Sequence, residues 1–249
     1  MADVMDVTRR DVVVLGGGPA GSITAALLAR AGADVALVER ERFPRFHLGE
    51  SITPASMTVL DSLGLRDALA GRYLPKFGVR FLCCRTGREQ RYDFRDAGLG
   101  EDECGYQVPR ANFDTVLLQH ARALGATVRE QCAAEDVLFE HGRARGVRVR
   151  HADGRREGFL ANVVVDATGQ DTLLASRLGT KRPVAGFDKT ALVAHYQHVA
   201  RHKEDEEGDL DVVLSPHGWV WNVPFLGEVN SVGAVCSATW AQSRSRGES

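Results

Sequence analysis

The pattern G-x-G-x-x-G at Gly16, Gly18 and Gly21 constrains the fold of this chain more than any other feature of its sequence. It follows the apolar, β-branched run 11–15, typical of a buried strand, and precedes apolar residues at helical spacing over 23–31. In such a turn the first glycine permits the tight bend, the second lets a pyrophosphate approach the backbone, and the third lets the helix pack on the strand. The helix N-terminus then offers unpaired N–H groups to the phosphates. The pattern therefore predicts a dinucleotide-binding strand–turn–helix unit.

A second apolar run, 35–38, ends at Glu39. Its distance from the glycine turn is close to the spacing of about 20 residues at which such units carry an acid for the ribose hydroxyls. Strand, helix and strand together predict a parallel pair with a right-handed crossover. The predicted nucleotide-binding residues in this region are Gly16, Gly18, Pro19, Ala20, Gly21 and Glu39.

Charge, apolar runs and cysteine content indicate which binding partners and which cellular compartment to expect for this chain. The 249 residues carry 31 Lys or Arg against 33 Asp or Glu, so no basic field predicts binding to nucleic acid or to an anionic membrane. No apolar run approaches the roughly 18 residues needed to span a bilayer, and the first six residues lack the basic start of a signal peptide. The five cysteines contain no C-x-x-C pair, which argues against a disulfide framework and a thiolate zinc site. We expect a cytoplasmic chain without a metal site.

The rest of the chain changes character along its length. The run 162–165 predicts a strand that ends at Asp166, ahead of Gly169, at the kind of position where α/β sheets hold ligands. Three apolar runs between 210 and 236 are separated by turn residues, as in an antiparallel sheet. We expect the stretch 203–207 to be a solvated acidic face and 241–249 to be an unstructured tail.

Three further motifs resemble those of the flavin-dependent halogenases. Arg45 opens an R-x-x-x-G-E-S run, Lys76 lies in the run 75–81 where that family carries its essential lysine, and 218–224 reads G-W-V-W-N-V-P. The family's own version of the last motif is G-W-x-W-x-I-P. The resemblance extends from residue 10 to about 237 and lies within the hydroxybenzoate-hydroxylase-like FAD monooxygenases. Tryptophan halogenases usually carry G-E-A, so G-E-S is more similar to the phenol- and pyrrole-acting branch.

The resemblance implies an α/β fold: a Rossmann-like FAD-binding domain of the glutathione-reductase/hydroxybenzoate-hydroxylase type with a partial antiparallel β-sheet substrate domain. We expect the FAD-binding domain over 1–175, interrupted at about 72–106 by strands of the substrate domain, and the partial substrate domain over 176–249. Family members are much longer, so the chain is expected to be truncated at its carboxyl end and to encode part of the flavin pocket. The residues that the resemblance adds to the cofactor site are Arg45, Gly49, Glu50, Ser51, Arg110, Val137, Asp166 and Gly169.

The resemblance also implies a reaction. FAD, as FADH2, reacts with O2 to a flavin hydroperoxide, and chloride or bromide attacks it to release hypohalous acid. Lys76 holds this oxidant, by a hydrogen bond or as a chloramine, beside an electron-rich aromatic substrate. Trp219 and Trp221 alternate along a predicted strand and form a barrier between substrate and flavin. The implied substrate is a phenol or a pyrrole, free or tethered to a carrier protein, and a separate flavin reductase supplies the reduced cofactor.

Simpler interpretations stand beside these. A lysine is by default a solvated surface residue, and two tryptophans in a sheet are by default core. The alternative enzyme is an FAD-dependent monooxygenase that uses NAD(P)H, and the alternative without turnover is an inactive truncated flavoprotein fragment. Lys76 and the double-tryptophan motif favour the halogenase over the monooxygenase.

Overall fold

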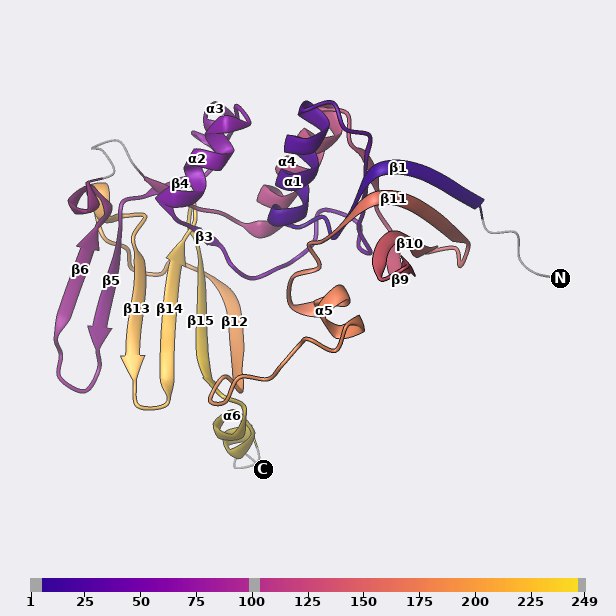
Figure 1. Cartoon of the computed structure of the whole chain (residues 1–249). Coiled ribbons are helices and arrows are strands. Elements are labelled where there is room, and N and C mark those ends of the chain that lie inside the picture. The colour runs from indigo at the N-terminus through magenta and orange to yellow at the C-terminus, as the bar shows by residue number, and fades with distance from the viewer. Residues whose placement is uncertain (1–5, 99–103, 246–249) are drawn as a thin grey trace. The chain divides into compact units, whose positions relative to one another are not determined.

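The computed structural model describes residues 6–98 and 104–245, and it divides into two compact units (Figure 1). The first unit combines Met1–Leu48 with Arg110–Arg182, and the second combines Gly49–Pro109 with Pro183–Ser249. Each unit is therefore assembled from two separate stretches of the chain. The sequence placed the boundary at 175 and the interruption at about 72–106.

The first unit is built on a six-stranded sheet in the order β8–β2–β1–β11–β10–β9. Its strands are β1 (Asp6–Leu15), β2 (Val35–Val38), β8 (Thr127–Arg129), β9 (Cys132–Glu140), β10 (Arg143–His151) and β11 (Arg156–Asp166). β1 pairs in parallel with β2 and β11, and β8 pairs in parallel with β2, whereas β9 and β10 add an antiparallel edge. The predicted parallel strand–helix–strand unit is confirmed.

Helices connect these strands. They are α1 (Pro19–Arg30), which joins β1 to β2, α4 (Arg110–Ala123), which leads into β8, and the short α5 (Leu173–Arg177). Figure 1 shows α1 and α4 side by side. The core of this unit comprises alternate residues of β1 and β2, such as Val13 and Val38, packed with Val137, Val147 and Phe159. Alternation places these side chains on one face of the sheet.

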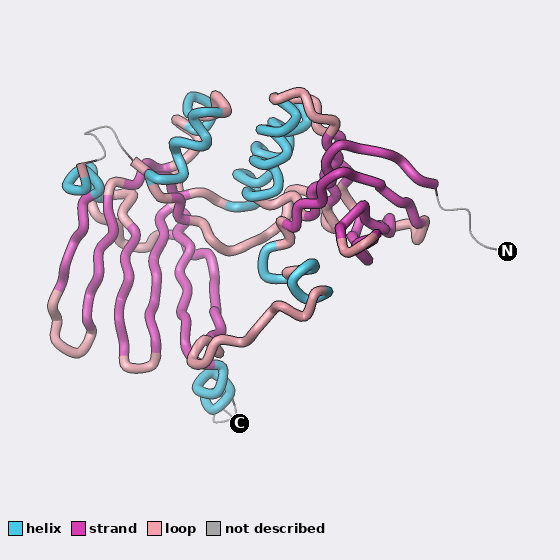
Figure 2. Tube along the Cα trace, viewed as in Figure 1, coloured by secondary structure: helices cyan, strands magenta, loops and turns pink. Residues whose placement is uncertain are grey.

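The second unit contains two sheets (Figure 2). The larger has the order β12–β15–β14–β13–β5–β6 and the smaller has the order β3–β7–β4. The strands of the larger sheet are β5 (Gly78–Cys83), β6 (Glu89–Asp93), β12 (Lys189–Gln197), β13 (Leu210–Ser215), β14 (Gly218–Pro224) and β15 (Val229–Ser237). The smaller sheet comprises β3 (Ser51–Ile52), β4 (Leu74–Lys76) and β7 (Gly105–Gln107). The helices of this unit are α2 (Pro54–Ser62), α3 (Arg66–Leu69) and α6 (Ala238–Ser245).

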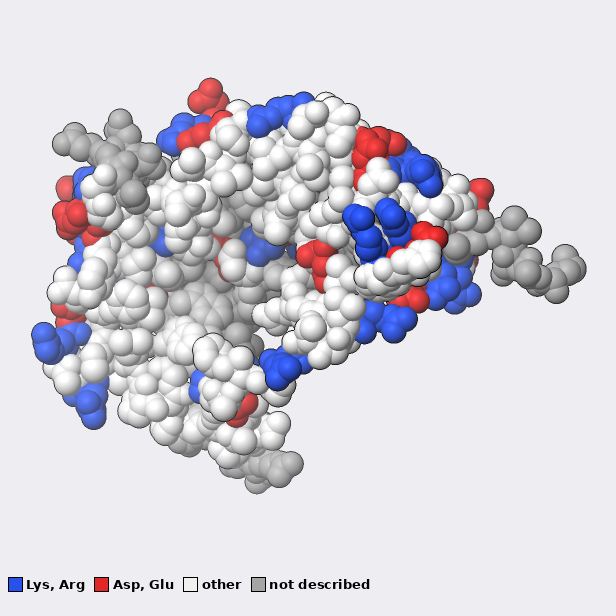
Figure 3. Space-filling model, viewed as in Figure 1, with Lys and Arg blue, Asp and Glu red and all other residues white. Residues whose placement is uncertain are grey.

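The predicted antiparallel character of the last third is confirmed for β12 to β15, whereas β13 and β5 pair in parallel. On the face of this unit seen in Figure 3, charged side chains gather toward β5 and β6, and the surface over β13 to β15 is largely uncharged. Large apolar side chains remain exposed on this sheet, among them Leu192 at 65% and Tyr196 at 53%.

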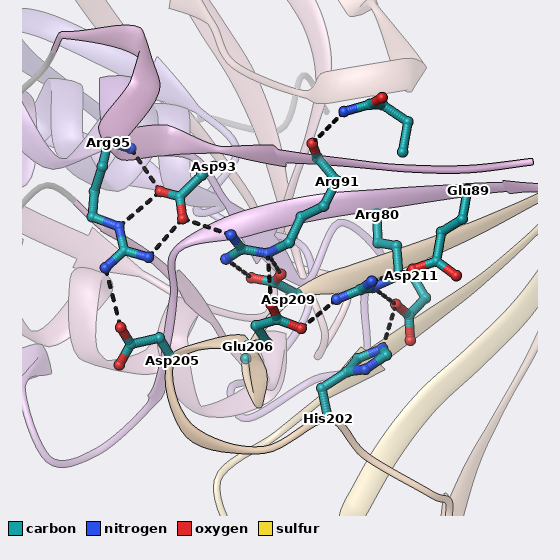
Figure 4. A network of polar contacts seen from close by, with 12 residues as sticks. Arg80, Glu89, Arg91, Asp93, Arg95, His202, Asp205, Glu206, Asp209 and Asp211 are labelled. Atoms are coloured by element: carbon teal, nitrogen blue, oxygen red, sulfur yellow. Dashed lines mark hydrogen bonds and ion pairs between the residues drawn. The ribbon is translucent and has the colours of Figure 1, made fainter.

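The stretch 203–207 is largely exposed, as predicted, and two of its carboxylates also form ion pairs. Glu206 pairs with Arg80, and Asp205 Oδ2 lies 3.1 Å from Arg95 Nη1 (Figure 4). One expectation from the sequence is wrong: the stretch from 241 is not an unstructured tail, because α6 continues to Ser245. Residues 246–249 lie outside the described residues. None of the helices within the described ranges combines the length and the apolar composition needed to cross a bilayer.

Candidate functional site

The three glycines of the turn differ in the space around them. Gly16 has φ +100°, and a Cβ there would lie 2.5 Å from the carbonyl oxygen of Ala167. A Cβ at Gly21 would lie 1.8 Å from the carbonyl oxygen of Gly16. At Gly18 the nearest atom is the end of the Arg45 side chain, at 3.6 Å. The first and third glycines are therefore required by the packing of the chain itself, and the second leaves space against the backbone.

The start of α1 adjoins this space. Gly18 is its N-cap and Pro19 its first residue, and no side chain caps the helix. The first N–H groups of an α-helix have no partner within the helix, and the helix dipole is positive at this end. The turn therefore offers backbone donors to an anion.

Glu39, at the end of β2, holds the glycine turn in place. Its carboxylate is buried and accepts hydrogen bonds from the backbone N–H groups of Gly17, at 2.7 Å, and Glu41, at 2.8 Å. Carboxylate oxygens have several acceptor sites, so Glu39 retains capacity for a ligand hydroxyl.

These residues surround a cavity of about 430 Å³ in the first unit. A volume of this size lies in the usual range of small-molecule sites, roughly 300–1,000 Å³. The predicted residues that line it are Gly16, Gly18, Pro19, Ala20, Glu39, Arg45, Arg110 and Gly169. Sequence reasoning missed other lining residues. Arg40, Cys132 and Ala134 lie in no recognised motif, whereas His47 lies within the run that Arg45 opens and Thr168 lies between Asp166 and Gly169.

Arg45 and Arg110 converge on one buried carboxylate. Arg110 donates two hydrogen bonds to Asp114, from Nε at 2.7 Å and from Nη2 at 2.9 Å. Arg45 Nη1 lies 3.1 Å from Asp114 Oδ2, but without hydrogen-bond geometry. Two guanidinium groups thus share one carboxylate, and among the described residues this buried nitrogen of Arg45 has no hydrogen-bond acceptor. The arrangement leaves positive charge and a donor for an anionic ligand.

Three other predicted cofactor residues of the first unit do not line the cavity. Gly21 is enclosed by the turn, and Val137 is 2% exposed within the sheet core. Asp166 accepts hydrogen bonds from the N–H groups of Thr168 and Leu174, at 3.1 and 2.7 Å. Burial raises the pKa of Asp166, but hydrogen bonds from the Thr168 hydroxyl and from these two N–H groups outweigh that effect and lower it below its ordinary value. Asp166 therefore remains ionised and fixes the loop after β11.

Lys76 is a buried residue of the second unit. It is 2% exposed, and its Nζ donates a hydrogen bond to Ser51 Oγ at 2.9 Å. Nζ also lies 5.0 Å from the centre of the Phe94 ring, a cation–π distance. Burial lowers the pKa of Lys76 from 10.5 to about 8, against a smaller upward effect of Asp209. With this pKa a minor fraction of the side chain is neutral amine at neutral pH. Because Lys76 is buried, the interpretation as a solvated surface lysine is wrong.

Asp209, the carboxylate that acts on Lys76, is fully buried and belongs to the network in Figure 4. Arg91 Nε donates to it at 2.6 Å. The neighbouring Gly208 is also fixed, because Gln107 Nε2 donates to its carbonyl oxygen at 2.8 Å. The hairpin β5–β6 and strand β7 together hold Asp209 near Lys76.

The G-E-S run lies at the start of the second unit. Gly49 has φ +98°, a left-handed conformation that favours glycine. Glu50 is buried, and its Oε1 lies 3.2 Å from Nε2 of His195 on β12. Ser51 begins β3 and contacts Lys76. In the second unit, adjacent residues of the run therefore contact His195, through Glu50, and Lys76, through Ser51.

Trp219 and Trp221 share one face of β14. Trp221 packs on Gly233 of β15, where a Cβ would lie 2.2 Å from the indole ring. Trp219 is 38% exposed. Trp221 is thus held by the sheet, and Trp219 presents part of its ring at the surface.

The histidines do not assemble a metal site. His195 pairs with Glu50, and His202 Nε2 lies 3.0 Å from Asp211 Oδ1. Across the part of the chain that the structure describes, no group of three or more His, Cys, Asp or Glu side chains is arranged to hold a metal ion.

Comparison with known proteins identifies the family. A family model described as an FAD binding domain matches residues 9–244. The chain belongs to this FAD-binding domain family. It is 34% identical to the 1H-pyrrole-2-carbonyl peptidyl-carrier-protein chlorinase of Pseudomonas fluorescens, over 90% of this chain and 55% of that protein. It is 31% identical to the tryptophan 2-halogenase of Chondromyces crocatus, over 90% of this chain and 42% of that protein.

A solved structure supports the same assignment. The myxobacterial chondrochloren halogenase CndH superposes with a TM-score of 0.86 at 33% identity, covering 96% of this chain and 55% of that one. The resemblance to flavin-dependent halogenases and the α/β fold, both predicted from the motifs, are therefore confirmed. The chain spans about half the length of the relatives that it matches.

Proposed function

We propose that the cavity of the first unit binds FAD. The unpaired donor of Arg45 and the open space at Gly18 fit a pyrophosphate, and Glu39 fits the ribose hydroxyls. Arg110 acts through Asp114 to keep Arg45 beside the turn. When bound and reduced, FAD with O2 supplies the oxidising equivalent that converts a halide ion to hypohalous acid.

We further propose that the complete protein halogenates an electron-rich aromatic ring, with Lys76 as the catalytic residue. The observation that carries this proposal is the burial of Lys76, whose Nζ is held by Ser51 and whose pKa is lowered to about 8. Within the part of the chain that the structure describes, the hydrogen-bond partner of Lys76 Nζ is a hydroxyl and no carboxylate bonds to it directly. Burying a lysine in this way is costly to the fold, which favours a chemical role.

Lys76 acts on the hypohalous acid in one of two ways. As an ammonium it donates a hydrogen bond to the oxygen, so that the halogen–oxygen bond breaks more readily. As an amine it displaces that oxygen and carries the halogen as a chloramine or bromamine, with water as the other product. In both cases a carbon–halogen bond forms on the ring, the ring proton is lost, and the displaced oxygen leaves as water.

The substrate that we propose is a phenol or a pyrrole. The similarity to a chlorinase of carrier-bound pyrrole supports a carrier-tethered ring, and the G-E-S run is consistent with that branch. A separate flavin reductase then supplies FADH2. Trp219 and Trp221 serve as a barrier that keeps the ring from being hydroxylated directly.

The test is product analysis with reduced FAD, O2 and bromide, using a panel of phenols and carrier-bound pyrroles. We expect a brominated product from the complete wild-type protein and none from its Lys76→Met variant. Lys189→Met, which removes an exposed lysine from β12, should leave bromination unchanged. A hydroxylated product without bromine would instead indicate a monooxygenase, and equal bromination by Lys76→Met would remove Lys76 from the mechanism.

A further inference from the structure

We propose that Ser51 is a positioning residue that holds the Lys76 side chain in its working orientation, an inference that rests on the proposed function. The sequence assigns Ser51 to the cofactor site through the G-E-S run. In the second unit its hydroxyl oxygen instead accepts a hydrogen bond from Lys76 Nζ at 2.9 Å.

The register of the small sheet explains how two residues far apart in sequence meet. β7 lies between β3 and β4, with Ser51 opposite Gln107 and Lys76 opposite Gly105. Residues 105 and 107 share one face of β7, and so do their partners. Strands two apart in a sheet are separated by about 9.5 Å, a span that only a long side chain closes. Lys76 therefore reaches across β7 to Ser51.

Gly105 permits this crossing. A Cβ at Gly105 would lie 2.0 Å from the carbonyl oxygen of Ile52, so β3 approaches β7 too closely for any side chain there. The face that Lys76 crosses is consequently free of a side chain at position 105. Nζ also lies over the Phe94 ring, 5.0 Å from its centre.

A hydroxyl suits this task better than a carboxylate. Ser51 accepts a hydrogen bond from the ammonium without neutralising its charge, so it fixes the direction of Nζ and leaves the proton removable. The carboxylate that acts on Lys76, Asp209, is itself engaged by Arg91. Ser51 thus orients Nζ, and Asp209 partly compensates its charge.

The first test measures Lys76 directly. The chain contains four lysines, at 76, 181, 189 and 203, so isotope-labelled lysine gives few side-chain NMR signals, and Lys76→Met identifies that of Lys76. In Ser51→Ala we expect the titration midpoint of Lys76 to fall by about one pH unit, as for the loss of a hydrogen bond to a charged group. Ser51→Thr, which keeps the hydroxyl, should restore it.

Ser62→Ala, which alters an exposed serine of α2, is the control and should leave the midpoint unchanged. An unchanged midpoint in folded Ser51→Ala would overturn the proposal, because the hydroxyl would then have no influence on Nζ.

The second test separates positioning from cofactor binding. We expect Ser51→Ala to lower kcat for bromination about tenfold with the Kd for FAD unchanged, and Ser51→Thr to recover kcat. A raised Kd for FAD with an unchanged Lys76 titration would assign Ser51 to the cofactor and overturn the proposal. If the complete wild-type protein yields no brominated product, the proposed function fails, and the titration of Lys76 still decides the role of Ser51.

Discussion

Lys76→Met removes a buried charge, and its effect on the free energy of unfolding should depend on pH. Burial lowers the pKa of Lys76 from 10.5 to about 8 in the folded chain. Below pH 8 the lysine is protonated in both folded and unfolded chains, and the whole cost of burying the ammonium is present. Between pH 8 and 10.5 the folded chain releases the proton while the unfolded chain keeps it, so the stability of the wild type rises with pH.

The magnitude follows from the size of this shift. Each pKa unit corresponds to about 1.4 kcal/mol, so the wild type regains about 1.4 kcal/mol by pH 9 and about 3.4 kcal/mol well above pH 10.5. Methionine does not titrate. The difference in unfolding free energy between wild type and Lys76→Met should therefore change by about 1.4 kcal/mol between pH 7 and pH 9 in favour of the wild type.

Urea unfolding followed by tryptophan fluorescence measures this difference. The three tryptophans, at 219, 221 and 240, all belong to the second unit, so the signal reports on the unit that contains Lys76. Lys189→Met controls for the loss of one positive charge. A difference between wild type and Lys76→Met that is the same at pH 7 and pH 9 would refute the reasoning, since Lys76 would then not titrate between these values.

Three further changes test other parts of the account. Gly18→Ala should raise the Kd for FAD at least tenfold and leave the Tm of the FAD-free chain within ~2 °C, because its Cβ meets the protein only at 3.6 Å. A large fall in Tm would show that Gly18 serves the fold. Arg91→Met leaves Asp209 buried without its partner and should lower the free energy of unfolding, measured in urea, by roughly 3 kcal/mol. If the variant is as stable as the wild type, the ion pair makes no net contribution to stability. Gly233→Ala should displace the Trp221 ring, costing about 2 kcal/mol and shifting the fluorescence maximum, and an unaltered spectrum would contradict the packing.

The glycine turn could be read from the sequence because its determinants are local. Strand, turn and helix each have a short-range pattern, and the spacing of Gly16, Gly18 and Gly21 assigns each glycine a separate steric task. The structure agrees for Gly16 and Gly21, and it leaves open space at Gly18. Glu39 was found in the same way, from its position at the end of the next strand.

Features that depend on register could not be predicted. Val137 was expected at the cofactor but lies in the core, whereas Ala134 and Cys132 line the cavity, although Cys132 also belongs to that core. A shift of one residue in the pairing of a strand moves its side chains to the opposite face of the sheet. The pairing of β9 with β10 contains register shifts of this kind. No local pattern in the sequence reveals them.

Contacts between segments far apart in the sequence could not be predicted either. The ion pairs of the acidic stretch 203–207 could not be predicted, because its arginine partners come from β5 and from the residues after β6, more than 100 residues earlier. The burial of Lys76 similarly requires Ser51, Gly105 and Asp209, which the fold collects from separate segments. The motif predicted a role for Lys76, and only the assembled small sheet explains its environment.

The most direct test of the account is a titration of the folded chain with FAD, following flavin fluorescence and Tm together. We predict saturable binding of one FAD per chain and a Tm that rises with FAD concentration, as expected for a ligand that binds only the folded state. Folded chain that shows no saturable binding and no change in Tm would contradict the assignment of the first-unit cavity to the cofactor.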